Sequence, residues 1–192
     1  MLDSTRKIFD TAKECFFQHG YSAASIAMIS RYSKVSRVTI HKQFSSKETL
    51  FRAFIQNFLL EKDVDIQTYI NSKGLFWEDT FDFLSQRCTE IFENIPSAII
   101  KADLYHAGQT HCADLLDENR MKTQQAIQMK LCQAINDKQL SLVNIGLSPE
   151  EFATNLESVA GGIMLSSSLE DPTEEMKTTL RIYQVASMIV NE

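Results

Sequence analysis

Basic and hydroxyl-bearing side chains are concentrated in residues 29–44, in a pattern that suits contact with duplex DNA. The forked donors of Arg37 match the edge of guanine, and Val38 is placed to touch a thymine methyl group. Hydroxyl and cationic side chains bind phosphate oxygens. We therefore predict DNA contacts from Ser36, Arg37, Val38, Thr39, His41, Lys42 and Lys47. The alternative is that these residues form an ordinary solvated helix face.

The elements that must position these side chains are two short helices meeting at a tight turn. The first helix of the chain is predicted at about residues 6–19, with Gly20 as its stop. A second starts near Ser25 and ends at Ser33-Lys34. Ser36 then caps a third, whose Ile40 and Phe44 face the core. This arrangement predicts a helix-turn-helix that inserts its last helix into the major groove.

A long helix of about residues 46–70 follows, and the segment Ser45–Glu48 reads as its capping box. Lys47 at its start is expected to meet phosphate, together with the free amides of the first turn. Because this helix begins beside the predicted DNA-reading unit and leaves it, we interpret it as a lever between two domains.

The remainder of the chain also has helical periodicity, and no segment alternates convincingly with period two. A helix is expected from Trp77 to Ile95. After Pro96 a short helix should reach Tyr105, with a break at Gly108, and a longer helix is expected at about residues 113–138. Ser148 and Asp171 precede prolines as start signals for helices of about 149–168 and 172–190. The predicted fold class is all-α, with a three-helix N-terminal domain in residues 1–50 and a larger helical domain in 51–192.

Charge is distributed unevenly along the chain. The net charge is −6, but residues 1–50 carry +4 and the remainder −10, as expected when only one end faces phosphates. The four cysteines lie far apart and are interpreted as reduced thiols, mostly buried. With no apolar run long enough for a membrane span and no signal-peptide pattern, we expect a cytoplasmic protein that does not contact membranes.

From Ile8 to Leu50 the chain resembles the TetR family of bacterial transcriptional regulators. The resemblance rests on Ile8-Phe9-Asp10-Thr11-Ala12, Phe16, Gly20-Tyr21, Ser25-Ile26, Ile29, Val35-Ser36, Thr39-Ile40, Phe44 and Ser46-Lys47-Glu48-Thr49-Leu50. Three positions depart from the family pattern. Ser33-Lys34 stand where the family usually has Ala-Gly, His41 replaces a phosphate-contacting Tyr, and Ala24 replaces a common Thr.

The resemblance implies a homodimer formed mainly by the last two helices, a palindromic operator in double-stranded DNA, and a small-molecule effector cavity among the middle helices. Candidate cavity residues are Trp77, Phe81, Tyr105, Met121, Gln125 and Met129, each of which has a core interpretation as well. Candidate interface residues are Gly161, Gly162, Met164, Leu165 and Tyr183. Adjacent glycines such as Gly161 and Gly162 destabilise a helix by about 2 kcal/mol. Close packing is one reason for their presence, either at a dimer interface or inside the chain.

Other functions have little support in the sequence. His106, His111, Cys112, Asp114 and Glu118 match no metal-ligand pattern, so we expect no metal or cofactor. No nucleophile–base spacing or phosphate loop appears, and we expect no enzymatic activity. We predict a ligand-released repressor that binds its operator as a homodimer. The alternative is a DNA-binding protein of the same fold without an effector, acting architecturally or through a protein partner.

Overall fold

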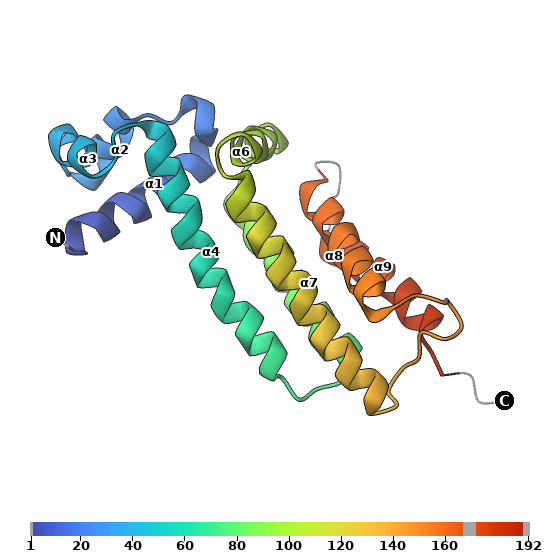
Figure 1. Ribbon diagram of the computed structural model, residues 1–192. Helices are drawn as coiled ribbons and strands as arrows, with labels where there is room; N and C mark the ends of the chain where they lie inside the picture. The colour runs from blue at the N-terminus through green and yellow to red at the C-terminus, as the bar shows by residue number, and fades with distance from the viewer. Residues whose placement is uncertain (1, 167–171, 190–192) are drawn as a thin grey trace. The chain divides into compact units, whose positions relative to one another are not determined.

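The computed structural model describes residues 2–166 and 172–189, with the side chains of residues 2, 3 and 88–94 left out. Within these residues all regular secondary structure is helical, which confirms the predicted all-α class (Figure 1). The helices are α1 (Leu2–Ala23), α2 (Ile26–Ser33), α3 (Arg37–Gln43), α4 (Lys47–Asn71), α5 (Phe76–Asn94), α6 (Ala98–His111), α7 (Ala113–Asn136), α8 (Pro149–Leu165) and α9 (Pro172–Ala186).

The chain divides into two compact units. Unit 1 comprises Met1–Glu61 and Glu93–Leu116, and unit 2 comprises Lys62–Phe92 and Asp117–Glu192. The predicted functional division at residue 50 stays a prediction, because compactness does not assign a role to either part. Each unit is described by itself below.

Local signals in unit 1 set several helix boundaries, although α1 begins at Leu2, before the predicted start near Arg6, and continues past a kink at Gly20 to Ala23. Gly20 interrupts α1 with φ 78°, a left-handed conformation that favours glycine. The side chain of Ser25 caps α2 by accepting from the Met28 amide, and Ser36 caps α3 in the same way. At α4 the predicted capping box is displaced by one residue, since Ser46 rather than Ser45 accepts from the amide of Thr49, at 3.1 Å.

The core of unit 1 is built from the apolar stripes of its first four helices. The predicted inward residues Ile8, Ile29 and Ile40 are fully buried. Phe16 is also buried, and its ring packs edge-on against Phe51 at 5.0 Å between centroids. Burial of side chains of this size contributes about 1.5–3 kcal/mol each. This core fixes which face of α3 remains outside.

The predicted break at Gly108 is wrong. Gly108 is buried inside α6, and its carbonyl accepts the Cys112 amide that ends the helix. A Cβ at this position would lie 3.2 Å from a methyl group of Leu116, so glycine permits close packing here. The glycine therefore serves contact between α6 and the start of α7 and does not terminate the helix.

Unit 2 has its own core, centred on Ile127, Leu131, Phe152 and Leu156. The predicted cap of α8 is confirmed, because Ser148 and Glu151 form a reciprocal capping box and Pro149 occupies the first turn. Helix α9 begins at Pro172 as predicted. Its proposed cap Asp171, like the Cys88 side chain, lies outside the described residues.

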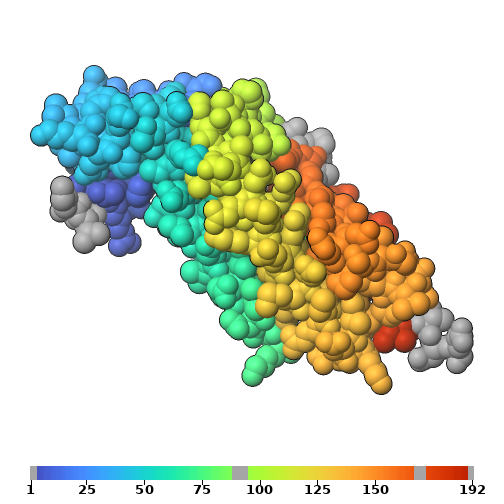
Figure 2. Space-filling view, viewed as in Figure 1, coloured from blue at the N-terminus to red at the C-terminus, as the bar shows by residue number. Residues whose placement is uncertain are grey.

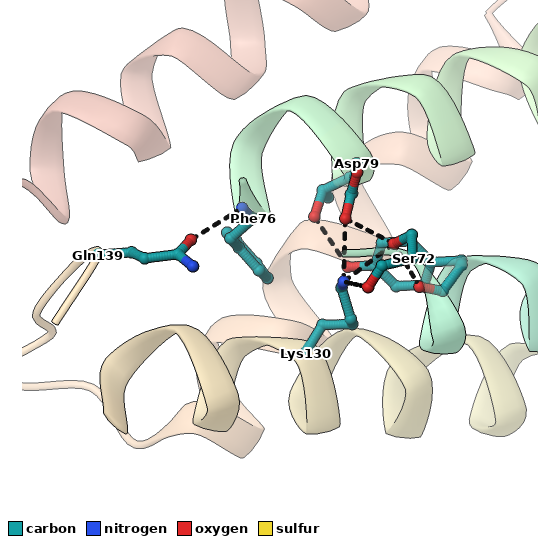
Figure 3. Close-up of polar contacts among 7 residues, drawn as sticks. Ser72, Phe76, Asp79, Lys130 and Gln139 are labelled. Carbon is teal, nitrogen blue, oxygen red and sulfur yellow. Dashed lines mark hydrogen bonds and ion pairs between the residues drawn. The ribbon is translucent and has the colours of Figure 1, made fainter. Parts of the chain in front are cut away.

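A buried ion pair joins three segments of unit 2 (Figure 3). The ammonium of Lys130, whose side chain is only 6% exposed, lies 2.9 Å from Asp79 Oδ2 and donates to the Ser72 carbonyl at 2.8 Å. The Ser72 hydroxyl donates to the same carboxylate at 2.5 Å. Nearby, the Phe76 amide donates to the side chain of Gln139. These contacts tie the α4–α5 connection to α7 and its C-terminal end.

Among the described helices, none combines the length and the hydropathy that a bilayer span requires. The thiols of Cys15 and Cys112 are buried and that of Cys132 is exposed, all three as free cysteines.

Candidate nucleic-acid interface

Helix α3 presents its leading end to solvent. Ser36, Arg37 and Val38 are exposed, Val38 at 65% of its surface, while Ile40 on the opposite side is fully buried. The light-blue atoms of this region lie uncovered in the space-filling view (Figure 2). An exposed valine beside an exposed arginine on a short helix is consistent with a surface that reads base edges.

The first turn of α3 is held in place by its own hydroxyl groups. Ser36 Oγ accepts from the amide of Thr39 at 3.1 Å and lies 2.9 Å from Thr39 Oγ1. Thr39 is half-buried as a result. Both hydroxyls thus stabilise the helix start, and each oxygen keeps capacity for a further hydrogen bond to phosphate.

The turn before α3 adopts the left-handed conformation without glycine. Lys34 has φ 57°, which costs a non-glycine residue of order 1 kcal/mol. Two hydrogen bonds offset this cost, because Ser30 Oγ donates to the Val35 carbonyl at 2.7 Å and the Val35 amide donates to Ser33 Oγ. The Lys34 side chain stays exposed, adding a cation beside α3.

Further cations surround this surface. His41 and Lys42 are exposed in the last turn of α3, as predicted from sequence. Arg31 and Tyr32, at the end of α2, are also exposed and were not among the predicted contacts. Both residues lie in the last turn of α2, directly before the tight turn. This position could have indicated them as DNA contacts from the sequence, because that end of α2 adjoins the start of α3.

Lys47 is placed differently from the sequence expectation. Its ammonium donates to the carbonyls of Tyr21, Ser22 and Ala24 at 2.9, 3.4 and 3.2 Å, and lies 4.3 Å from the centre of the Tyr21 ring. Its three N–H groups therefore all have acceptors in the chain segment that follows Gly20. This geometry favours a structural role for Lys47 over contact with phosphate.

A carboxylate from α6 fixes the same segment. Asp103 accepts from the amide of Ser22 at 2.9 Å and from the Ser22 hydroxyl. Partial burial acts to raise the pKa of Asp103, but these hydrogen bonds and the charge of Lys47 outweigh it and lower that pKa. A Cβ on Gly20 would collide with the Asp103 carboxylate, so glycine is required there for two reasons.

Two of the residues that could have served as metal ligands, His111 and Asp114, have other partners. His111 Nδ1 lies 3.7 Å from Glu48, and Asp114 forms a two-point contact with Arg52. The side-chain hydrogen bond from Arg52 lowers the pKa of Asp114 to about 2. Among the described residues, no group of three or more His, Cys, Asp or Glu side chains forms a metal-binding arrangement.

The predicted effector residues differ in their exposure, and their role in ligand binding stays a prediction. Trp77 and Phe81 pack at the edge of the unit 2 core, whereas Met121, Gln125 and Met129 are exposed on α7. Tyr105 is half exposed and belongs to unit 1. Unit 2 instead holds a small cavity of about 20 Å³ next to Arg87 and Glu157, and an open groove of about 250 Å³ next to Ser72 and Asp79.

The predicted interface residues divide between two environments. Gly162 is exposed with open space around it, and Leu165 is half exposed. Gly161 and Met164 line the small cavity. The Tyr183 ring packs on Phe152, and its hydroxyl donates to Asn155 at 3.1 Å.

Residues 8–54 match the family described as bacterial regulatory proteins, tetR family. The match contains α2, α3 and the first turns of α4. The comparison with curated proteins finds no match.

Solved structures with the same fold extend over nearly the whole chain. A TetR transcription regulator from Haloarcula marismortui aligns with a TM-score of 0.76 at 16% identity, covering 97% of each chain. A TetR-family regulator from Agrobacterium tumefaciens aligns at 0.74 and 17%, covering 98% of this chain and 99% of its own. SmeT, the repressor of the Stenotrophomonas maltophilia multidrug efflux pump SmeDEF, aligns at 0.69 and 16%, covering 96% and 90%.

Proposed function

We propose that the protein is a TetR-family repressor that binds a palindromic operator as a homodimer and is released by a small molecule. The match of residues 8–54 to the tetR family supports this proposal. The observation that carries the DNA-binding part is the exposure of Arg37 and Val38 at the leading end of α3, with Ile40 anchoring the helix from behind. A recognition helix needs one exposed face that can reach the base edges and an opposite apolar face that anchors it to the domain core.

Specificity and general affinity come from different side chains in this proposal. Arg37 reads guanine and Val38 a thymine methyl group, while Ser36, Thr39, His41 and Lys42 contact phosphate. Arg31 and Lys34 join the phosphate-binding set, because both are exposed beside α3. Lys47 supports this surface by holding the segment behind it.

Dimerisation is supported by an apolar stripe on α9. Ile182 and Val185 are 66% and 61% exposed, and Ile189, beyond the end of the helix, is also exposed. In a lone chain these side chains meet only water, so pairing with a second copy would bury them. Leu165 and Gly162 on α8, which packs against α9, are exposed as well (Figure 1).

Release by a ligand would be a population shift. A ligand that binds one orientation of α4 more tightly than another changes the separation of the two recognition helices. Both half-sites then cannot be engaged together, and the affinity gained from simultaneous binding is lost.

The effector-independent alternative draws on one specific observation. The small cavity of unit 2, at about 20 Å³, has room for about one water molecule, far below the several hundred Å³ of drug-sized pockets. On this alternative the protein would bind DNA with an affinity that no small molecule changes.

Selection from a random duplex library with the purified full chain tests the DNA-binding proposal. We expect an inverted repeat to be enriched and to shift in a gel as a complex of two chains per duplex. Failure to enrich any sequence, together with no affinity for duplex DNA at low ionic strength, would overturn the proposal.

A further inference from the structure

The turn between α2 and α3 lies in a stretch of sequence that has no acidic residue. Between Glu14 and Glu48 the chain contains neither Asp nor Glu. The Lys and Arg residues of the same stretch are Arg31, Lys34, Arg37, Lys42 and Lys47. A run of cations without carboxylates is expected where the binding partner itself supplies the negative charge.

Three of these cations are evenly spaced across the turn. Arg31 lies in the last turn of α2, Lys34 ends that helix, and Arg37 is the first residue of α3 (Figure 1). All three are exposed, and within the described part of the chain none of them forms an ion pair with a carboxylate. Elsewhere in unit 1, by contrast, Arg52 is paired with Asp114. The charges around the turn are therefore available to an anionic partner.

The conformation of the turn does not depend on the Lys34 side chain. Ser30 Oγ donates to the Val35 carbonyl at 2.7 Å, and the Val35 amide donates to Ser33 Oγ at 3.2 Å. The Lys34 backbone is left-handed, with φ 57° and ψ 20°, a conformation that favours glycine. Glycine would keep both hydrogen bonds and remove the backbone strain. The turn by itself thus gives no reason for a lysine at this position.

A second left-handed lysine occurs at the end of α7. Lys138 has φ 58° and is exposed, so its backbone is nearly the same as that of Lys34. Its surroundings differ, because Asp137 precedes Lys138 directly, whereas the sequence around Lys34 is free of acids. A left-handed backbone alone therefore does not indicate a function. The charge around Lys34 and its place before α3 distinguish it from Lys138.

The position of the turn favours contact with phosphate over contact with bases. In a helix-turn-helix the first helix crosses the DNA backbone and the second lies in the major groove. The turn connects these two regions and lies at the edge of the groove, where phosphate oxygens are the nearest acceptors. Lys34 is three residues before Arg37, so their Cα atoms are at most about 11 Å apart. Both residues can therefore contact the same half-site.

We propose that Lys34 binds a phosphate of the DNA backbone at the edge of each half-site and supplies the phosphate contact that the sequence predicted for Lys47. The inference rests on the proposed DNA-binding function and assigns one of its contacts to a residue. The Lys47 ammonium donates to three backbone carbonyls, so its N–H groups are occupied. The Lys34 ammonium has no acceptor among the described residues.

An alternative role of Lys34 is to stabilise α2, because a cation at the end of a helix interacts favourably with the helix dipole. Lys34→Gln separates the two roles, since it keeps a long polar side chain and removes the charge. On the dipole alternative, this variant unfolds at a lower temperature than the wild type and binds DNA equally well.

Salt titrations of DNA affinity with the full-length Lys34→Gln variant test the proposal. The loss of one phosphate contact lowers the slope of log affinity against log salt by about 0.9. We expect the affinity at 0.1 M salt to fall about five- to tenfold, equally for a selected operator and for single-mismatch duplexes. Lys34→Arg keeps the charge and should keep the slope.

Lys34→Gly removes the charge and the strain together. We expect the same loss of DNA affinity as in Lys34→Gln, with a melting temperature about 2–4 °C above that of Lys34→Gln. Lys138→Gly is the matched control, because it relieves the same backbone conformation in unit 2. Its DNA affinity and salt slope should equal those of the wild type.

An unchanged salt slope in Lys34→Gln, with wild-type binding intact, refutes this inference and leaves the proposed function standing. An affinity loss confined to the operator would assign Lys34 to a base edge and would also overturn the phosphate contact. Absence of DNA binding by the wild type at low ionic strength refutes the proposed function itself, and this inference with it.

Discussion

The ammonium of Lys47 lies 4.3 Å from the centre of the Tyr21 ring and donates to the Tyr21 carbonyl at 2.9 Å. This pair joins the first turn of α4 to the segment following the kink at Gly20. Two further carbonyls, of Ser22 and Ala24, complete the contacts of the ammonium. The same lysine was expected from sequence to contact phosphate, and the two roles predict different outcomes for its removal.

We predict that Lys47→Ala lowers the free energy of unfolding by about 1–3 kcal/mol, because two partly buried carbonyls and one exposed carbonyl lose their donor. The dependence of DNA affinity on salt should keep its slope. Lys42→Ala is the matched comparison, with unchanged stability and a salt slope reduced by about one. Denaturant unfolding and salt titrations of both variants measure these effects. If the salt slope of Lys47→Ala instead falls by about one, Lys47 contacts phosphate and the structural role is contradicted.

Arg37→Ala should weaken operator binding by about 1–3 kcal/mol and relax the preference at one base step, because the forked contact to guanine is lost. Lys73→Ala removes an exposed charge in the connection before α5 and should leave the binding unaltered. Gel-shift affinities are compared for operator and single-mismatch duplexes. Equal losses for Arg37→Ala on every duplex would reassign this side chain to phosphate.

Asp103 should make unit 1 sensitive to acid. Its pKa is lowered in the folded protein, so its contribution to stability is present above the unfolded pKa of about 3.9 and is lost as pH falls through the folded value. Asp103→Asn should be less stable by about 1 kcal/mol at pH 7, through weaker hydrogen bonds to Ser22. The difference from the wild type should shrink below about pH 4. A difference independent of pH in urea titrations would argue against a charged acceptor.

The buried pair of Lys130 and Asp79 predicts a large effect of single substitutions. Lys130→Ala leaves the carboxylate without its cation and should cost about 3–5 kcal/mol. Replacing both residues by apolar ones should cost less than Lys130→Ala alone, because no uncompensated charge remains. Exposed Lys177→Ala provides the control with unchanged stability. Additive losses in the double variant, from calorimetric unfolding, would show that the two charges are not coupled.

Features set by neighbouring residues were predictable from the sequence. The caps at Ser25, Ser36 and Ser148 and the stop at Gly20 depend on side chains within three or four residues of the helix end. The exposed side of α3 followed in the same way, because Ile40 and Phe44 define its buried side.

Features set by distant residues were not predictable. Gly108 resembles a helix stop, and only the approach of Leu116 shows why the helix continues through it. The contact of Lys130 with Asp79 spans 51 residues of sequence, and that of Lys47 with Tyr21 spans 26. Cavity residues are equally non-local, since Arg87, Thr123 and Glu157 come from three helices.

Hydroxyl-radical footprinting of the wild-type complex on a selected duplex tests the central claim most directly. Two symmetric recognition helices should protect two half-sites whose centres lie about 34–36 Å, or one helical turn, apart. Protection of guanine N7 from methylation by dimethyl sulfate, measured on the same duplex, should disappear at the same position of both half-sites in Arg37→Ala. A single protected site bound by one chain, or protection that Arg37→Ala leaves unchanged, would contradict the account.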